Sequence, residues 1–120
     1  MTKKNKKVQS LKKKQAFKQV YSRGKYAADS LFVVYALANE AEANRLGLSV
    51  SKKVGNAVVR NRVKRWLKES YRLLTHDASF RFYDFVIVAR ASVGELPGDG
   101  AFNKVSGSLD RLFRKLGILL

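Results

Sequence analysis

The sequence predicts an α+β fold with the element order αβββαβα, a sandwich in which helices pack against one mostly antiparallel, four-stranded sheet. Two apolar runs of strand length, 31–38 and 83–90, are rich in β-branched and aromatic residues, as buried strands are. Two other segments, 57–74 and 102–116, repeat apolar residues every three or four positions, which is typical of amphipathic helices. No internal repeat or linker divides the chain, so we expect residues 1–120 to form one domain.

The composition excludes several classes of protein. Hydrophobic residues make up 46% of the chain, which is enough to build a core, so the chain as a whole is not expected to be disordered. The absence of cysteine excludes disulfides and zinc–cysteine sites. The longest apolar run, 31–38, is too short to span a bilayer, and no apolar segment follows the Lys-rich N-terminus as it would in a signal peptide. We therefore expect a soluble, intracellular protein.

The N-terminal part is expected to contain a basic arm and then a helix. Residues 1–10 are Lys-rich and lack apolar periodicity, so we expect them to form a mobile arm. A short amphipathic helix is expected within 11–24, because apolar residues stand there at helical spacing before a glycine that would end the helix. These residues are Phe17, Val20, Tyr21 and Gly24.

Strands are expected next. A short one is predicted near 26–28, and longer ones at 31–38 and 46–54. The segment between the two longer strands, 41–45, is turn-like, so we expect them to pair as an antiparallel hairpin.

The second half is expected to be helix, strand, loop and helix. Asn56 is a plausible N-cap for the helix at 57–74, and the apolar run at 83–90 suits a buried strand. Three glycines and the only proline make 91–100 a loop, and 102–116 is the last helix. Because the helix at 57–74 connects two strands, we expect it to lie across the sheet.

The helix at 57–74 has an apolar side and a basic side. The apolar side consists of Val59, Val63, Trp66, Leu67, Ser70 and Leu74. The basic side consists of Arg60, Asn61, Lys64, Arg65, Lys68 and Arg72, with Tyr71 at the border and Arg62 near Glu69. We expect the apolar side to dock on the sheet and to hold the basic side as a fixed row. Acids do not compensate this row, which favours external phosphates over internal salt bridges as its partners.

The net charge points to a polyanionic partner. The chain carries 25 Lys and Arg against 9 Asp and Glu, a net charge of +16. Residues 1–28 contain no acid, and residues 45–72 contain only Glu69. The positive charges of such a domain repel one another, so we expect a polyanion to bind it. Nucleic acid is the favoured candidate. A membrane-surface or calmodulin-target helix is a weaker interpretation, because the apolar side is needed for the core.

Aromatic and polar side chains suggest a second binding surface. Each of Phe17, Tyr21 and Tyr35 is by itself more typical of the core than of a binding site. However, Phe17 and Tyr21 stand one helical turn apart among lysines, where aromatic rings can stack on single-stranded bases. The strand at 46–54 alternates apolar and polar residues, so its polar side could line a groove. The polar residues are Ser49, Ser51 and Lys53.

The polypeptide offers no active site of its own. His76 is the only histidine, which excludes a histidine-based triad or metal cluster. Asp77 and Asp84 are not arranged as a general acid and base, and the glycine spacing of a P-loop is missing. We therefore expect no catalytic residue and no metal ligand.

Other functions remain open at this point. One is a general RNA-binding module with no enzyme attached. Another is a DNA-binding protein with 57–74 as recognition helix, although a strand stands directly before it where a helix-turn is usual. A stand-alone nuclease is the weakest of these alternatives, because the sequence has no pair of acids and no histidine positioned for catalysis.

The segment KKVGNAVVRNRVKRWLKE, residues 52–69, resembles the RNR motif of the bacterial ribonuclease P protein family. Other stretches resemble the family in the same order and cover essentially the whole chain: the residues around 17–24, then FVVYAL, GLSVSKK, DFVIVAR and LFRK. The matching motif positions are Lys53, Gly55, Ala57, Val58, Arg60, Asn61, Arg62, Lys64, Arg65 and Glu69, with Lys68 where arginine is common.

The resemblance implies both a fold and an activity. The family fold is αβββαβα with a left-handed crossover, which the general right-handed preference would not predict. Ribonuclease P is an endonuclease, a ribonucleoprotein that removes the 5′ leader from precursor tRNA. Its RNA subunit carries the hydrolysis with bound Mg²⁺, while the small basic protein binds that RNA and the leader in the bacterial cytoplasm. No membrane and no small-molecule substrate is implied.

The resemblance also assigns roles to residues. The motif residues are expected to meet the catalytic RNA, and a cleft between helices and sheet is expected to receive the leader. Residues expected on the catalytic RNA are Lys53, Arg60, Asn61, Arg62, Lys64, Arg65 and Lys68. Residues expected on the leader are Phe17, Tyr21, Tyr35, Ser49 and Ser51, together with Arg60 and Asn61.

Overall fold

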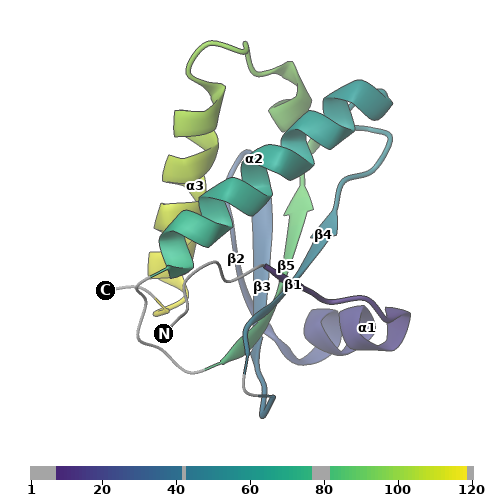
Figure 1. Ribbon diagram of the computed structural model, residues 1–120, viewed down its shortest axis with the longest axis vertical. Helices are drawn as coiled ribbons and strands as arrows, with labels where there is room; N and C mark the ends of the chain where they lie inside the picture. Colours follow the sequence, from purple (N-terminus) through teal and green to yellow (C-terminus); the bar gives the residue numbers. More distant parts are fainter. Residues whose placement is uncertain (1–7, 42, 77–81, 119–120) are drawn as a thin grey trace.

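The computed structural model describes residues 8–41, 43–76 and 82–118, and it confirms the α+β class (Figure 1). The predicted helices and strands are present with somewhat different ends, and a short 3₁₀ helix, η1, lies inside the predicted loop at 91–100. In chain order the elements are β1 (Gln9–Ser10), α1 (Lys14–Arg23), β2 (Lys25–Ala28), β3 (Phe32–Ala38), β4 (Arg45–Ser49), α2 (Ala57–Thr75), β5 (Tyr83–Ala89), η1 (Ala91–Glu95) and α3 (Ala101–Lys115).

The sheet has five strands in the order β1-β4-β5-β3-β2, where four were predicted. The predicted hairpin between 31–38 and 46–54 is wrong, because β5 lies between β3 and β4. The β2–β3 and β3–β5 pairs are antiparallel, but β4–β5 and β1–β4 are parallel, so the sheet is mixed. The physical reason is burial: β5 carries apolar side chains on both faces, and only a central position covers both of them.

The extra strand, β1, falls within the predicted basic arm. Gln9 pairs with Arg45 and Ser10 with Leu46 in parallel register, and the backbone N–H of Leu11 donates to the Leu46 carbonyl at 2.9 Å. Residues 9 and 10 are therefore part of the sheet rather than of a mobile arm. Residues 1–7 of that predicted arm lie outside the described residues.

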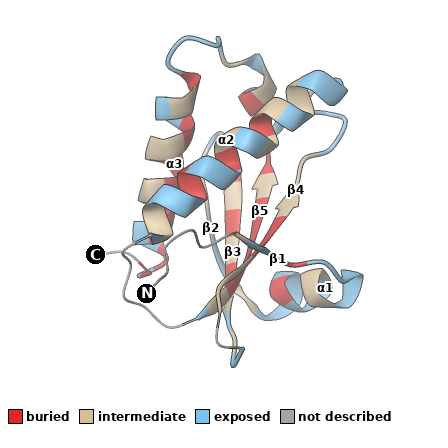
Figure 2. Cartoon of the chain, viewed as in Figure 1, coloured by how far each residue is buried: buried red, intermediate tan, exposed pale blue. Residues whose placement is uncertain are grey.

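Helices cover both faces of the sheet. α2 and α3 pack on one face, over a core that includes Phe85, Ile87 and Phe113, while α1 packs on the other, over Val86 (Figure 1). Figure 2 shows the buried side of α2 turned toward the sheet and its exposed side turned outward. This separation puts the basic side of α2 and the aromatic side of α1 in different layers of the molecule.

α2 forms the crossover between the adjacent parallel strands β4 and β5. In Figure 1 both strands run upward, α2 passes in front of the sheet, and β5 lies to the left of β4, which makes the crossover left-handed. This handedness agrees with the resemblance and departs from the general preference for right-handed crossovers. The helix crosses the sheet obliquely, as predicted from its position between two strands.

Tyr71 of α2 is buried rather than at the border of the apolar side. It is 3% exposed and packs edge-on against Phe85 at 5.6 Å and Phe113 at 6.4 Å between ring centroids. Burial raises the pKa of Tyr71, with a smaller contribution from the Asp84 charge. Tyr71 therefore belongs to the platform that holds α2 on the sheet. Within the described residues no helix is both long and apolar enough to cross a membrane.

Candidate nucleic-acid interface

The start of α2 is fixed by local hydrogen bonds. The Asn56 side-chain oxygen accepts from the backbone N–H of Val59 at 3.0 Å, which confirms the predicted N-cap. Arg60 Nη1 donates to the Gly55 carbonyl oxygen at 2.8 Å. A Cβ on Gly55 would stand 2.8 Å from Val59 Cγ1, so this position requires glycine. The first turn is thus closed onto the loop before it, and Arg60 has a defined direction.

A row of polar and basic side chains follows along the outer side of α2. We call it the RNR face, and it consists of Arg60, Asn61, Lys64, Arg65 and Lys68. Asn61, Arg65 and Lys68 are exposed, while Arg60 and Lys64 are half-buried. Within the described part of the chain, none of its cations forms an ion pair. No acidic side chain of the described residues therefore neutralises the charge on this face.

Two other arginines of α2 differ from the RNR face. Arg72 is paired with Glu69, its Nη2 lying 2.6 Å from Glu69 Oε2, and this hydrogen bond lowers the pKa of Glu69. Arg62 and Glu69 stand two turns apart on α2, and among the described residues they form no ion pair. The Arg62 guanidinium lies over the Trp66 ring, 5.6 Å from the centroid. Its Nε is buried and has no hydrogen-bond partner among the described residues.

Lys53 is exposed in the loop before α2, where its backbone N–H donates to Ser51 Oγ at 3.3 Å.

A second feature lies on the opposite face of the sheet, under α1. Strand register aligns four residues in one row across the sheet: Gly47 of β4, Val86 of β5, Tyr35 of β3 and Tyr26 of β2. α1 crosses this row. Its buried Val20 packs in one cluster with Val86.

The aromatic side chains of α1 complete a continuous set of rings. A Cβ on Gly47 would stand 2.5 Å from Phe17 Cζ, so the Phe17 ring lies directly over the strand backbone at this glycine. Ring centroids are separated by 6.4 Å for Phe17–Tyr21, 5.0 Å for Tyr21–Tyr35 and 5.6 Å for Tyr26–Tyr35. Aromatic surface therefore extends from β4 to the edge strand β2.

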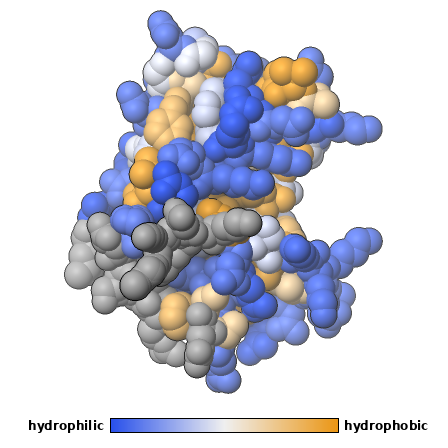
Figure 3. Space-filling view, viewed as in Figure 1, coloured by the Kyte–Doolittle hydropathy of each residue, from blue (hydrophilic) through white to orange (hydrophobic). Residues whose placement is uncertain are grey.

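An open pocket of about 700 Å³ lies along this flank of α1. Its lining combines aromatic rings with lysines and a serine: Lys12, Lys14, Phe17, Lys18, Tyr21 and Ser22. In Figure 3 the right side of the molecule is notched between a hydrophilic lobe over the start of α2 and another over α1, with paler and orange surface between them. We call the pocket, together with Tyr35, the aromatic cleft.

The structure brings together only part of the predicted leader site. Phe17, Tyr21 and Tyr35 lie within ring contact of one another, and Ser49 is in the adjacent row of the same sheet face, paired with Val88. Ser51 lies beyond the end of β4 on the exposed loop. Sequence reasoning missed Gly47 and Tyr26. A glycine inside a strand is a known signal of close approach by another group and could have indicated the Phe17 contact.

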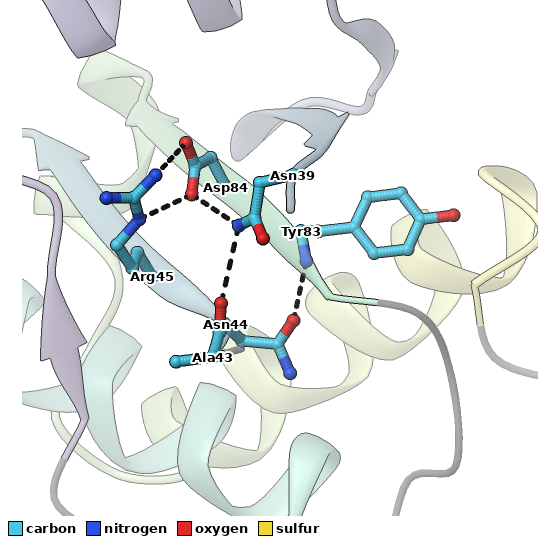
Figure 4. Close-up of polar contacts among 6 residues, drawn as sticks. All are labelled: Asn39, Ala43, Asn44, Arg45, Tyr83 and Asp84. Atoms are coloured by element: carbon cyan, nitrogen blue, oxygen red, sulfur yellow. Dashed lines mark hydrogen bonds and ion pairs between the residues drawn. The ribbon is translucent and has the colours of Figure 1, made fainter. Parts of the chain in front are cut away.

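The buried carboxylate of Asp84 is fully occupied in holding strands together (Figure 4). It is 6% exposed and accepts from Arg45 Nε at 2.8 Å, from Arg45 Nη2 at 2.9 Å and from Asn39 Nδ2 at 2.7 Å. These contacts give it a structural role rather than an acid–base role. His76 follows the end of α2, and Asp77 lies outside the described residues. Among the residues described, no three of the His, Asp or Glu side chains form a group that could hold a metal ion.

Comparisons with known proteins agree with this geometry. The family described as ribonuclease P matches residues 5–117. The ribonuclease P protein component of Caldanaerobacter subterraneus subsp. tengcongensis is 46% identical over 109 residues, covering 91% of this chain and 90% of that protein. The protein of the same name from Exiguobacterium sibiricum is 44% identical over 115 residues, covering 94% of both. A solved structure of the Staphylococcus aureus RNase P protein superposes with a TM-score of 0.81 at 31% identity, covering 95% of this chain and 100% of that one.

The matches cover nearly the whole chain, and the sequence and structure comparisons agree, so they show the family of this protein. The RNR motif lies on α2, where the cations of the RNR face have no ion-pair partner among the described residues. The chain therefore belongs to the ribonuclease P protein family and is the accessory protein subunit of that RNA-based endoribonuclease, which acts in the 5′ processing of tRNA.

Proposed function

We propose that the RNR face binds the catalytic RNA of ribonuclease P and that the aromatic cleft binds the 5′ leader of precursor tRNA. The observation that carries the proposal is the separation of two surfaces of different chemistry on one rigid sheet. One is a row of cations that form no ion pair with any described residue, and the other is a set of contiguous aromatic rings beside lysines.

The RNR face suits the backbone of a folded RNA. Arginine grips phosphate with a planar fork and lysine supplies a point charge, and both are present on this face. Because Val63 and Leu67 fix the helix on the sheet, the row is already ordered before RNA binds. Less conformational entropy is then lost on association. Arg60 and Asn61, at the start of α2, are the members proposed to meet the leader as well as the catalytic RNA.

The aromatic cleft suits a single strand of variable sequence. Leaders differ between tRNA precursors, so recognition must tolerate any base. Stacking on aromatic rings does so, because every base has a π-face, and it contributes about 1–3 kcal/mol per base. The pocket lysines, Lys12, Lys14 and Lys18, supply positive charge for the backbone phosphates of the same strand.

The proposed contribution of the protein is electrostatic as well as geometric. Mg²⁺ is assigned to the RNA subunit, where it serves the hydrolysis. A protein with a net charge of +16 that lies between two RNAs reduces their mutual repulsion. Less Mg²⁺ is then needed to hold the substrate, because protein cations replace part of the counterion atmosphere. This role places the protein in the bacterial cytoplasm with its RNA partners.

The direct test is cleavage of a precursor tRNA by a bacterial ribonuclease P RNA at low Mg²⁺, with and without this protein. We expect strong stimulation, a correct mature 5′ end, and no cleavage by the protein alone. A precursor whose leader is reduced to a single nucleotide is the matched control, and it should be stimulated much less. Equal stimulation of both substrates would remove the leader-binding proposal. Tight RNA binding without stimulation would leave a general RNA-binding module.

A further inference from the structure

Tyr26 extends the aromatic surface beyond the cleft. It lies on β2, the edge strand of the sheet, directly opposite Tyr35 of β3 in antiparallel register. The two ring centroids are 5.6 Å apart and the ring planes are inclined by 35°. Tyr26 is thus the last ring of a series that begins with Phe17 over β4.

Tyr26 contributes little to the core. It is 66% exposed, more than Tyr21 at 41%, and it belongs to neither hydrophobic cluster. The sheet row that it ends also contains Gly47, over which Phe17 lies. A single exposed aromatic residue needs no explanation by itself, but one that continues a row of contacting rings presents a further face to the same ligand.

We propose that Tyr26 is an additional stacking subsite for a base of single-stranded RNA, at the β2 end of the aromatic row. The inference rests on the proposed leader binding and deepens it. The Phe17 end of the row lies over β4, the strand that leads into α2 and the RNR face. A leader that runs from the RNR face along the rings therefore reaches Tyr26 last. The bases that stack on Tyr26 are then those farthest from the cleavage site.

The position of Tyr26 makes its effect depend on leader length. Leaders too short to cross the row stack on Phe17 and Tyr21 but never reach β2. Loss of the Tyr26 ring should therefore leave their affinity unchanged and weaken only longer leaders. Because Tyr26 is largely exposed, we expect the loss to lie at the lower end of the range for a stacked base, about fivefold in affinity.

The experiment measures the affinity of the reconstituted ribonucleoprotein for precursors whose leaders are lengthened one nucleotide at a time. Tyr26→Ala and Tyr26→Val should show a step at a defined length beyond which they bind about fivefold more weakly than wild type. Tyr26→Phe should follow wild type throughout. Leu73→Ala removes another exposed apolar side chain, 51% exposed on α2, and serves as the control.

A fluorescent base, 2-aminopurine, moved along the leader gives a second measurement. Tyr26→Ala should abolish the quenching of 2-aminopurine at one leader position. The fluorescence at the other leader positions should stay as in wild type. A loss of affinity at every leader length would mean that Tyr26 only orients Tyr35, and it would overturn the subsite. No loss at any length would also overturn it. If Phe17→Ala and Tyr35→Ala have no effect on leader affinity either, the proposed function itself fails.

Discussion

The ring of Phe17 occupies the space that a side chain at residue 47 would need. A Cβ on Gly47 would stand 2.5 Å from Phe17 Cζ and 2.8 Å from Phe17 Cε2. Real Cβ atoms do not approach other atoms so closely, so any side chain at this position displaces the ring. Glycine in β4 is therefore a condition for the position of Phe17 in the aromatic cleft.

Gly47→Ala should weaken binding of leader-bearing precursor tRNA without weakening binding of the catalytic RNA. The displaced ring loses the stacking geometry, and we expect a loss of about 1 kcal/mol for the leader contribution. The measurement is the ratio of affinities for precursor and mature tRNA. Gly98→Ala is the matched control, since a Cβ there meets nothing within 4 Å. An unchanged ratio in Gly47→Ala would contradict the assignment of Phe17 to the leader.

Arg65→Ala should weaken association with the catalytic RNA and reduce its salt dependence. Arg65 is exposed and, within the described residues, has no acidic partner. Its removal should lower the slope of log affinity against log salt by about 1. Arg72→Ala is the control, because Arg72 lies on the same helix but is already paired with Glu69. Equal changes in both variants would show that net charge, rather than the RNR face, controls RNA binding.

Asp84→Asn should destabilise the fold while leaving the RNA affinity of the folded protein unchanged. The substitution removes the negative charge of the carboxylate, whose two oxygens accept hydrogen bonds from Arg45. Hydrogen bonds to charged groups are worth about 1.5–3 kcal/mol, and Arg45 is partly exposed, so we expect a loss of about 2 kcal/mol. Urea unfolding measures it. Glu69→Gln breaks an exposed pair and should cost much less than Asp84→Asn, because solvent screens such a pair. Equal costs in the two variants would contradict the structural role of Asp84.

Stability should also depend on pH through Asp29, in the turn between β2 and β3. Its carboxylate accepts from the backbone N–H groups of Leu31 and Phe32, each at 2.9 Å, and from the Ser108 hydroxyl of α3. Burial alone would raise the pKa of Asp29. The Ser108 and backbone hydrogen bonds outweigh burial, helped by the Arg111 charge at 3.9 Å, and the pKa is lowered.

A lowered pKa in the folded state means that Asp29 stabilises the fold when ionised. Its contribution is complete above the pKa of an unfolded aspartate, about 3.9, and disappears as the pH falls through the lower folded value. The stability difference between wild type and Asp29→Asn should therefore be largest near neutral pH and shrink below about pH 4. Asp110→Asn, in an exposed pair with Arg114, is the control. A difference that grew on acidification would contradict this assignment.

The sequence was sufficient for elements with local signals. α2 could be predicted because its cap, Asn56, and its apolar side are read from neighbouring residues. The basic side of α2 could be predicted from the same periodicity of apolar residues, because it lies opposite the apolar side. Phe17 and Tyr21 could be paired because they stand one helical turn apart.

Long-range pairing was beyond sequence reasoning. The apolar run of β5 indicated burial but not its neighbours, and strands of similar character at β3 and β4 suggested a hairpin instead. β1 has only two residues in a Lys-rich segment, so no periodicity identifies it. Tyr26 became visible as a neighbour of Tyr35 only when the strand register was known. The handedness of the crossover has no local signal and entered only through the family resemblance.

The central position of β5 has a consequence for the order in which the protein matures on the ribosome. Synthesis proceeds from the N-terminus, so β3, β4 and the whole of α2 emerge before residues 83–89 exist. Until then β3 and β4 have no partner between them, and the apolar side of α2 has an incomplete surface to cover. The RNR face therefore becomes a fixed array only after β5 has been inserted. A nascent chain stopped before Tyr83 would carry the RNR motif without the platform that orients it.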